Sequence, residues 1–414
     1  ASISAEEAIQ VVREEYPEDA FVYFQEDIRQ TSITYENVAL HCWAVFTDIP
    51  AEWGMLGDRQ YMEHLVTYQG VYLGYMLVNT TKELQPGDNV AYAAAMSWFL
   101  DKSAQTCTRE VTRHDGTTVE LTFPVVRDEL TGIYYLADPN RHILVADYDS
   151  FEYHGELVPM SSEDNLDWPE HYLLTYNTYI QVYDFFYSHG MDSVDGFGMP
   201  ILILADCCNY DGTPIDNAFF AGFDLGWAKF GASAVNDYGE CVDVIGHEFT
   251  HGITTYTFAG DLYENESGAV NEALSDIMGN LIEMILGATE DETWLIAENT
   301  GNPIRSMSFP WLFKQPVEIG GEFYYPTEGT NAYSFDSGGV HINSSLVNYV
   351  AWELCAQGMT LEEAYNLWRE TINLLTPLSE FREVHAALMF AAEILQMDVE
   401  WLGRIDMLCK QAGY

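Results

Sequence analysis

One pentapeptide restricts the fold of this chain more than any other feature, the run His-Glu-Phe-Thr-His at residues 247–251. On a helix, residues four apart project from the same face, so His247 and His251 can bind a single ion. Glu248 lies about 100° around the helix from His247, where its carboxylate can take a proton from water without binding the ion. The pattern predicts a zinc site with Glu248 as general base. A buried helical face whose two histidines bond to backbone stays open as the alternative.

A catalytic zinc ion needs a third protein ligand and one open position. About twenty residues after His251, Glu272 and Asp276 lie four apart in a second segment with helical periodicity. One carboxylate can bind the ion while the other holds a ligand histidine in place. Such a pair would by itself be an ordinary acidic helix face. Because it follows the pentapeptide, we predict that this pair provides the third zinc ligand.

The composition excludes several classes of protein. Apolar residues make up 48% of the 414 residues, which excludes a wholly disordered chain, and this length implies two or three domains. The formal net charge of −49 repels phosphate backbones and anionic membranes, so we expect no nucleic-acid partner. No run reaches the roughly 20 apolar residues that a membrane span needs. An exported or salt-adapted protein and a calcium-binding one both account for the acidic excess.

The termini and the cysteines bear on the cellular compartment. The first twenty residues are too highly charged for a signal peptide, so we expect that any export signal was removed before this numbering begins. The seven cysteines are dispersed and include no Cys-x-x-Cys pair, so we expect free thiols.

Periodicity and turn residues predict an α+β chain with a β-rich half followed by a helical half. The predicted strands are 38–46, 63–78, 119–126, 132–137, 142–147 and 199–205. The predicted helices are 5–15, 90–100, 169–189, 242–255, 270–286, 342–356, 360–374 and 379–395. We therefore expect a small α+β domain at 1–82, a linker at 83–104, a β-rich lobe at 105–241 and a helical lobe at 242–414.

Five separated motifs resemble those of the thermolysin-like zinc metallopeptidases. They are VIGHEFTHGITTYTFAGDLYENESGAVNEALSDIMGNLIE at 244–283, NPIRSMS at 302–308, DSGGVHINSSLVN at 336–348, LTPLSEF at 375–381 and DNAFF at 216–220. The resemblance covers about 105–414 and implies a two-lobed zincin fold, with zinc in the cleft between a β-rich lobe and a helical lobe. It implies a secreted endopeptidase that cuts internal peptide bonds of proteins, with an apolar residue preferred after the bond.

Matching positions carry the catalytic roles of that family onto this chain. The resemblance implies that His247, His251 and Glu272 bind zinc. It implies that Asp276 orients His247, with Asn271 as a further supporting residue. His341 and Tyr263 would stabilise the developing oxyanion, and Asp336 would position His341. Stabilising that charge is usually the largest catalytic contribution, so loss of His341 should reduce rate more than affinity.

The resemblance also implies substrate and calcium contacts. Arg305 would hold the substrate backbone, Asn217 and Ala218 would pair with the peptide as a strand, and Val244 and Ile304 would line the site for the residue after the cut. The matching calcium carboxylates are Asp243, Glu283 and Glu298. Thr293 and Leu295 stand where the family has carboxylates, which favours one calcium ion over two. A solvated acidic patch without an ion remains the alternative.

The N-terminal segment has its own resemblance and its own alternatives. ISAEEAIQVV at 3–12, followed by paired strands, is similar to a PepSY module, which occurs in propeptides of these enzymes. Residues 1–100 would then inhibit the enzyme as a prosegment, and the chain would be a zymogen. A small accessory domain is the alternative. We expect a monomer that acts on protein or peptide substrates; a catalytically silent protein with a structural zinc site is the competing interpretation.

Overall fold

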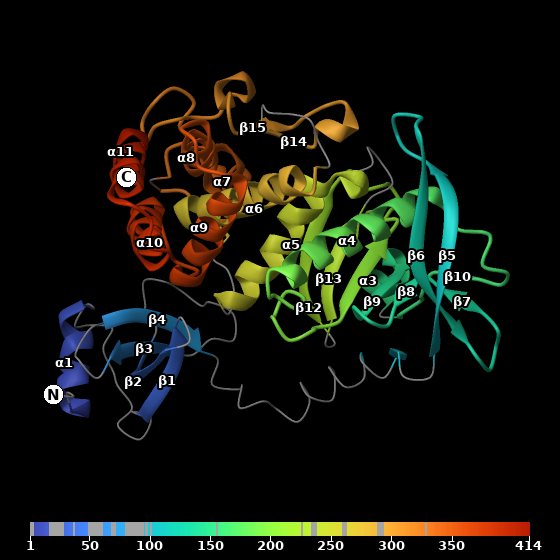
Figure 1. Ribbon diagram of the computed structural model, residues 1–414, viewed down its shortest axis with the longest axis horizontal. Coiled ribbons are helices and arrows are strands. Elements are labelled where there is room, and N and C mark those ends of the chain that lie inside the picture. The colour runs from blue at the N-terminus through green and yellow to red at the C-terminus, as the bar shows by residue number, and fades with distance from the viewer. Residues whose placement is uncertain are drawn as a thin grey trace. The chain divides into compact units, whose positions relative to one another are not determined.

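A computed structural model describes most of the chain (Figure 1). The described residues are 4–15, 29–35, 38–48, 61–67, 72–78, 95, 98–99 and 102–414 apart from 155, 225–226, 233–237, 259–262, 288–293 and 328. The chain divides into two compact units, Ala1–Gly87 with Phe258–Leu262 and Asp88–Thr257 with Tyr263–Tyr414. Each unit is described by itself. The four segments expected from the sequence, 1–82, 83–104, 105–241 and 242–414, stay a prediction.

The described residues of the smaller unit form a helix and an antiparallel four-stranded sheet. Its strands, in spatial order, are β1 (Arg29–Tyr35), β2 (Val38–Asp48), β3 (Tyr61–Thr67) and β4 (Tyr72–Val78). Helix α1 (Ala5–Glu15) begins with a capping box, in which the Ser4 hydroxyl accepts the Glu7 N–H and the Glu7 carboxylate accepts the Ser4 N–H. The single strand predicted at 63–78 is two strands, since a run rich in strand-forming residues does not show where the chain reverses.

The β-rich part of the larger unit contains two sheets. The first has the order β10-β7-β6-β5, dominated by the hairpin of β5 (Lys102–Thr112) and β6 (Thr118–Asp128). The short strands β7 (Tyr134–Tyr135) and β10 (Ser161–Ser162) complete it. Gly116 turns the hairpin with a φ of 80°, a conformation that favours glycine.

The second sheet, of order β12-β13-β11-β9-β8, borders the helical part. Its members are β8 (Ala137–Asp138), β9 (Ile143–Asp147), β11 (Ile201–Ala205), β12 (Ala218–Asp224) and β13 (Trp227–Ala232). Every residue of β11 is buried, as expected for a parallel strand covered on both faces. Strand β12 pairs antiparallel with β13 and forms the edge, so its outer backbone groups have no strand partner within this sheet.

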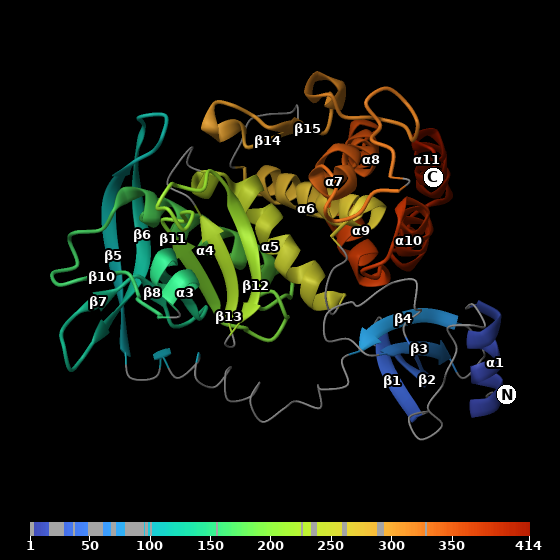
Figure 2. The ribbon, with the colours of Figure 1, turned by 180° about the vertical axis from the view of Figure 1, so that it is seen from behind.

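Helices account for most of the remaining chain. Figures 1 and 2 show α5 (Val242–Thr257) between the second sheet and the helices that follow. Those helices are α6 (Asn265–Leu286), α7 (Asp336–Asn343), α8 (Ser345–Ala356), α9 (Leu361–Leu374), α10 (Phe381–Ile394) and α11 (Val399–Ala412). In the β-rich part, α3 (Tyr148–His154) lies between β9 and β10 in the chain, and α4 (Glu170–Ser188) packs against α5.

Two glycines let α5 and α6 approach backbone to backbone. A Cβ atom at Gly279 would lie 2.2 Å from the carbonyl oxygen of Asp243 and 3.0 Å from the backbone nitrogen of His247. A Cβ atom at Gly246 would lie 3.0 Å from the Cα of Gly279. The helices that carry the predicted zinc ligands are therefore in direct main-chain contact.

The predicted elements and the observed ones agree in type and differ mainly at their ends. The helix predicted at 270–286 begins earlier, at Asn265, and the one predicted at 342–356 is two helices that meet at Ser344. Only residues 95, 98 and 99 of the helix predicted at 90–100 are described, and they are helical. The strand predicted at 132–137 is two short strands, β7 and β8. The elements that periodicity missed include β1, α3, β5, β10, β12, β13 and α11.

Candidate functional site

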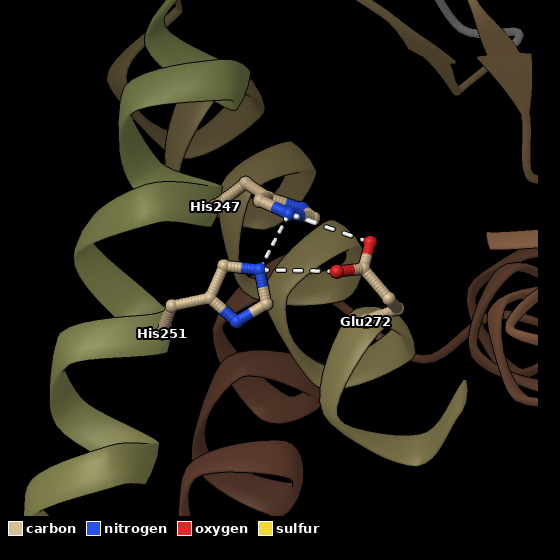
Figure 3. A group of neighbouring side chains, drawn as sticks. All are labelled: His247, His251 and Glu272. Atoms are coloured by element: carbon tan, nitrogen blue, oxygen red, sulfur yellow. Dashed lines mark hydrogen bonds and ion pairs between the residues drawn. The ribbon is translucent and has the colours of Figure 1, made fainter. Parts of the chain in front are cut away.

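The three predicted zinc ligands lie together in the structure (Figure 3). His247 and His251 project from α5, and Glu272 projects toward them from α6. The Nε2 atoms of the two imidazoles are 2.9 Å apart, and the carboxylate oxygens of Glu272 lie 3.2 Å from Nε2 of His251 and 3.6 Å from Nε2 of His247. The candidate ligand atoms all lie within 4.8 Å of one another.

The hydrogen bonds of the two Nδ1 atoms show how the rings of His247 and His251 are oriented. Nδ1 of His247 lies 2.8 Å from Oδ1 of Asp276, and Nδ1 of His251 lies 2.8 Å from Oδ1 of Asn271. Because those oxygens accept hydrogen bonds, each Nδ1 carries the proton and donates it. Each Nε2 atom then faces the other ring and the Glu272 carboxylate, on the side where a metal ion would be bound.

Glu272 also fits a cation. Its Oε2 atom is buried and accepts no hydrogen bond from the part of the chain that the structure describes. Burial raises the pKa of Glu272, but the neighbouring His341, His247 and His251 outweigh burial and hold that pKa well below its usual range. Two imidazoles and one carboxylate, with an orphaned oxygen among them, form a donor set that suits zinc.

Asp276 connects this cluster to two other segments. Its carboxylate accepts bonds from Arg305, at 3.0 Å from Nε and 2.7 Å from a terminal nitrogen, and from the side-chain amide of Asn348 at 2.8 Å. Burial raises the pKa of Asp276, but Arg305 and His247 outweigh burial and lower it to about 2. Asp276 is therefore a fixed anion beside His247.

Sequence reasoning missed Asn348 and Ser275. Asn348 lies on α8 and is buried, and the hydroxyl of Ser275 lies 3.1 Å from Nδ1 of His251. Both residues fall within motifs that were noted for other residues. Serine and asparagine occur so widely that only the folded packing distinguishes these two.

Glu248, the predicted general base, lies on α5 beside the sheet edge. It is buried, and its Oε2 accepts the backbone N–H of Phe220 in β12 at 2.7 Å. Its Oε1 lies 4.0 Å from Nε2 of His247. Burial is the main reason that the pKa of Glu248 is raised, an effect that the nearby His247 opposes. A carboxylate with a raised pKa is suited to accept a proton.

His341 and Tyr263 both contact Glu272 and each other. Nε2 of His341 lies 3.3 Å from Oε2 of Glu272 and 3.2 Å from the hydroxyl of Tyr263, which itself donates to Oε1 of Glu272. Burial and the Glu272 charge raise the pKa of Tyr263, so its hydroxyl keeps its proton. Both side chains can therefore present a donor to the same small region.

A left-handed turn places His341. Residues 336–339 all have positive φ, from 48° to 91°, so the first half of α7 is not a regular helix. A Cβ atom at Gly338 would lie 2.3 Å from Oδ1 of Asn265, which explains glycine there. The turn brings the Asp336 carboxylate back onto His341, at 3.0 Å from its backbone nitrogen and 2.5 Å from Nδ1.

The predicted substrate contacts are distributed around this centre. Asn217 is exposed and immediately precedes Ala218, the first residue of edge strand β12. Arg305 and Ser306 form the short strand β15 (Arg305–Ser306), which pairs with β14 (Leu295–Ile296). Val244 is buried on α5, and Ile304 is partly exposed beside Arg305. The structure shows Arg305 bonded to Asp276 and does not test any of the substrate roles.

A second cluster contains the predicted calcium ligands. Asp243 on α5, Glu283 on α6 and Glu298 in η5 (Glu298–Thr300) bring carboxylate oxygens within 4.8 Å of one another. Oδ2 of Asp243 accepts the Ala297 N–H at 2.5 Å, while its Oδ1 and Oε2 of Glu298 are buried without a hydrogen-bond partner among the described residues. Burial and the Glu298 charge raise the pKa of Asp243 to about 7.

Leu295 and Thr293 stand where the family has further calcium carboxylates. The backbone carbonyl of Leu295 accepts the side-chain amide of Asn280 at 3.0 Å. Thr293 lies outside the described residues. The three-carboxylate cluster has the oxygen donors that a hard cation prefers.

The sequence of this chain is similar to those of thermolysin-type metallopeptidases. Residues 109–255 match the family model described as "Thermolysin metallopeptidase, catalytic domain", and residues 259–400 match "Thermolysin metallopeptidase, alpha-helical domain". The thermostable neutral protease NprT of Geobacillus stearothermophilus is 33% identical over 51% of this chain and 39% of its own length. Thermolysin of Alicyclobacillus acidocaldarius is 31% identical over 63% of this chain and 49% of its own length. The chain therefore spans at most about half the length of these relatives.

Among solved structures, the precursor of protealysin, a metalloproteinase from Serratia proteamaculans, has a similar fold. The TM-score is 0.51 with 23% sequence identity, over 66% of this chain and 87% of that one. This likeness bears on the fold alone.

Proposed function

The chain belongs to the thermolysin metallopeptidase family, and from that membership we propose that it is a zinc metalloendopeptidase that hydrolyses internal peptide bonds of proteins. One observation carries the proposal. The two imidazoles and the carboxylate converge with their acceptor atoms facing inward, while Glu248 and His341 lie next to the cluster without belonging to it. A structural zinc site has no use for either.

The proposed chemistry assigns a task to each side chain. His247, His251 and Glu272 would hold zinc, which when bound polarises carbonyl groups and lowers the pKa of water toward about 7. Glu248 would accept a proton from the attacking water at its carboxylate and deliver it to the leaving amine. The bond from Phe220 N–H fixes one oxygen of Glu248, leaving the other free to turn toward that proton.

Charge develops on the carbonyl oxygen during the attack, and two donors are in place for it. Nε2–H of His341 and the Tyr263 hydroxyl would stabilise that charge. Asp336 accepts from Nδ1 of His341, which favours the charged, doubly protonated ring. Arg305, held by Asp276, would contact the substrate backbone.

The substrate would bind as an added strand. Asn217 and Ala218 lie at the free edge of the second sheet, where an extended peptide can form main-chain hydrogen bonds. Val244 and Ile304 would contact the residue after the cut and favour an apolar side chain there.

The acidic cluster of Asp243, Glu283 and Glu298 would bind one calcium ion. One oxygen each of Asp243 and Glu298 is buried without a hydrogen-bond partner among the described residues, which supports this, because a negative charge is costly to bury without a counterion. Calcium there would join α5 to α6 on the side of Gly279 away from Glu272.

We extend the proposal to location and latency. An extracellular location is supported by relatives such as the extracellular elastase of Staphylococcus epidermidis. The segment 1–100 would act as a prosegment that delays activity until it is cleaved, and the mature enzyme would be a monomer.

The substitution Glu248→Gln tests the proposal. Glutamine keeps the oxygen that accepts from Phe220 but cannot take a proton, so hydrolysis of unfolded protein and any self-cleavage near residue 100 should fall by at least about 100-fold. Zinc content, measured by atomic absorption, should stay at one ion. Zinc-loaded wild-type protein that cleaves no unfolded substrate, even after removal of residues 1–100, would refute the proposal.

A further inference from the structure

Five large apolar side chains form an exposed surface on the helical part, here called the aromatic surface. Three come from the segment around η6 (Pro310–Phe313), and their exposed fractions are 42% for Phe309, 45% for Trp311 and 71% for Leu312. The other two, Tyr349 and Trp352, are partly buried on α8. Exposed rings gathered in this way mark an interaction site more often than scattered apolar residues do.

The rings of the aromatic surface contact one another. Centroids of Phe309 and Trp311 are 5.6 Å apart, and those of Tyr349 and Trp352 are 5.3 Å apart. Two further contacts at 6.4 Å, Phe309 with Trp352 and Trp311 with Tyr349, join the pairs. The surface is therefore a continuous group of four rings, with the more exposed Leu312 on the same segment as Trp311.

Hydrogen bonds attach both ends of the η6 segment to the candidate active site. At one end, the Phe309 N–H donates to the Ser306 hydroxyl at 3.1 Å, and Ser306 directly follows Arg305. At the other end, the side-chain amide of Gln315 donates to the backbone carbonyl of His341 at 2.6 Å. The segment thus joins the residue proposed to hold the substrate backbone to the residue proposed to stabilise the oxyanion.

Helix α8 provides a second connection. Asn348, which bonds to Asp276, lies four residues before Trp352, so both project from the same face of α8. The aromatic surface therefore continues from the supporting residues of the zinc cluster. It is not a remote patch.

Distance along the chain limits how far the surface lies from the site. Phe309 lies four positions after Arg305, and an extended chain covers at most about 3.6 Å per position, so their Cα atoms are within about 14 Å. An extended substrate covers the same distance with about four residues. Because Arg305 is proposed to bind beside the residue after the cut, the surface lies within reach of substrate residues farther along on that side.

We propose that the aromatic surface is an additional substrate-binding site that holds aromatic or large aliphatic side chains about three to five residues after the bond that is cut. This inference rests on the proposed endopeptidase function and adds a substrate class to it: unfolded polypeptides with an apolar segment downstream of the cut. The net charge of −49 favours substrates whose apolar segment is flanked by basic residues.

Three fluorogenic peptides test the inference with the zinc-loaded chain, assayed both at full length and after its segment 1–100 has been cleaved. They share the residues around the scissile bond. The short peptide ends two residues after it, one long peptide carries Trp and Phe at the third to fifth positions, and the other carries Ser there. Wild-type protein should cleave the aromatic long peptide with a KM about tenfold lower than that of the serine peptide.

The double variant Trp311→Ser/Leu312→Ser should bring that KM ratio close to one and leave kcat/KM for the short peptide unchanged. Leu312→Ser alone, at the most exposed position, should reduce the ratio partly without endangering the fold. Leu130→Ser is the matched control, because Leu130 is 97% exposed in the β-rich part and should not affect the ratio.

Several results would overturn the inference. An unchanged KM ratio in the variants would do so, as would an equal loss of activity on the short peptide, which would mean that the segment only supports His341. Sedimentation that shows a wild-type dimer and a variant monomer would make the surface a contact between copies. Failure of wild-type protein to cleave even the short peptide, also after removal of residues 1–100, would instead refute the proposed function.

Discussion

Asp276 is the residue on which most of the site depends. Its two oxygens serve His247, Arg305 and Asn348, which come from three separate elements, α5, β15 and α8. A carboxylate in this position fixes the ring orientation of a metal-binding histidine and increases its basicity. It also neutralises a buried guanidinium that would otherwise be costly to bury.

Asp276→Asn should therefore weaken zinc binding by about 10- to 100-fold. The amide can still accept from His247 but no longer carries the charge that Arg305 requires. Competition with a chromophoric chelator measures the zinc affinity directly. Asp406→Asn is the control, since Asp406 pairs with Lys410 on the surface of α11. Equal zinc affinity in both variants would contradict the assigned role of Asp276.

At the residue scale, spacing alone was enough to select some residues of the site and not others. The intervals between His247, His251 and Glu272 correspond to metal geometry on helices, and the structure brings these three together. His341 and Tyr263 became visible only through the family resemblance, because a loop histidine and one tyrosine among 27 carry no periodic signal. The bond from Asn348 to Asp276 spans 72 residues and depends on tertiary packing alone.

At the element scale, the contact between α5 and α6 sets the geometry of both ion clusters. His247 and Asp243 lie one turn apart on α5, on either side of Gly246, while Asp276 and Glu283 lie on either side of Gly279 on α6. The backbones touch at these glycines, so no side chain there can adjust to relieve a clash.

Gly279→Ala should destabilise the protein by about 1–3 kcal/mol, because its methyl group would overlap the Asp243 carbonyl. The overlap outweighs the gain in helix propensity of about 1 kcal/mol. Gly403→Ala in α11 is the matched control, since a methyl group there meets nothing within 4 Å and should stabilise the protein. Thermal unfolding of both variants in a Glu248→Gln background, which prevents self-digestion, measures the difference. Similar melting temperatures for the two variants would contradict the close-packing argument.

The elements that sequence patterns missed share a physical cause. Strand β12 reads AFFAGFD, and its Phe219 covers Gly231 of β13, so aromatic packing stabilises a pair whose glycines resemble loop residues. Helix α11 buries only one side through widely spaced apolar residues, and Asp398 caps it with bonds to two backbone N–H groups. Long, strongly periodic helices such as α4 and α5 were predicted within two residues of their ends.

At the scale of the whole molecule, calcium and protons should compete for the same buried cluster. The folded pKa of Asp243, about 7, exceeds the value of about 3.9 expected for the unfolded chain, so the folded state binds the proton more tightly. Protonated Asp243 therefore contributes to the free energy of unfolding at low pH, and this contribution is lost as pH rises toward 7. Above about pH 7, where Asp243 has lost its proton, a calcium ion can neutralise the carboxylates of the cluster.

Addition of Ca²⁺ to calcium-free, zinc-loaded protein should raise the melting temperature more at pH 7.5 than at pH 5. Differential scanning fluorimetry of the Glu248→Gln protein measures the shift at each pH. Asp243→Asn should lose most of the shift. A shift of equal size at both pH values, or one that survives this substitution, would count against a calcium site at Asp243.

The main-chain contact at Gly246 and Gly279 also bears on how a protein of this kind can change over time. The two helices touch there without intervening side chains. The distance between the two predicted ion clusters is therefore set by covalent geometry and the helical rise. A residue inserted within either helix would rotate one cluster by about 100° and separate its ligands. Within this helix pair, a change of length is therefore expected to be tolerated in the link between α5 and α6 rather than inside either helix.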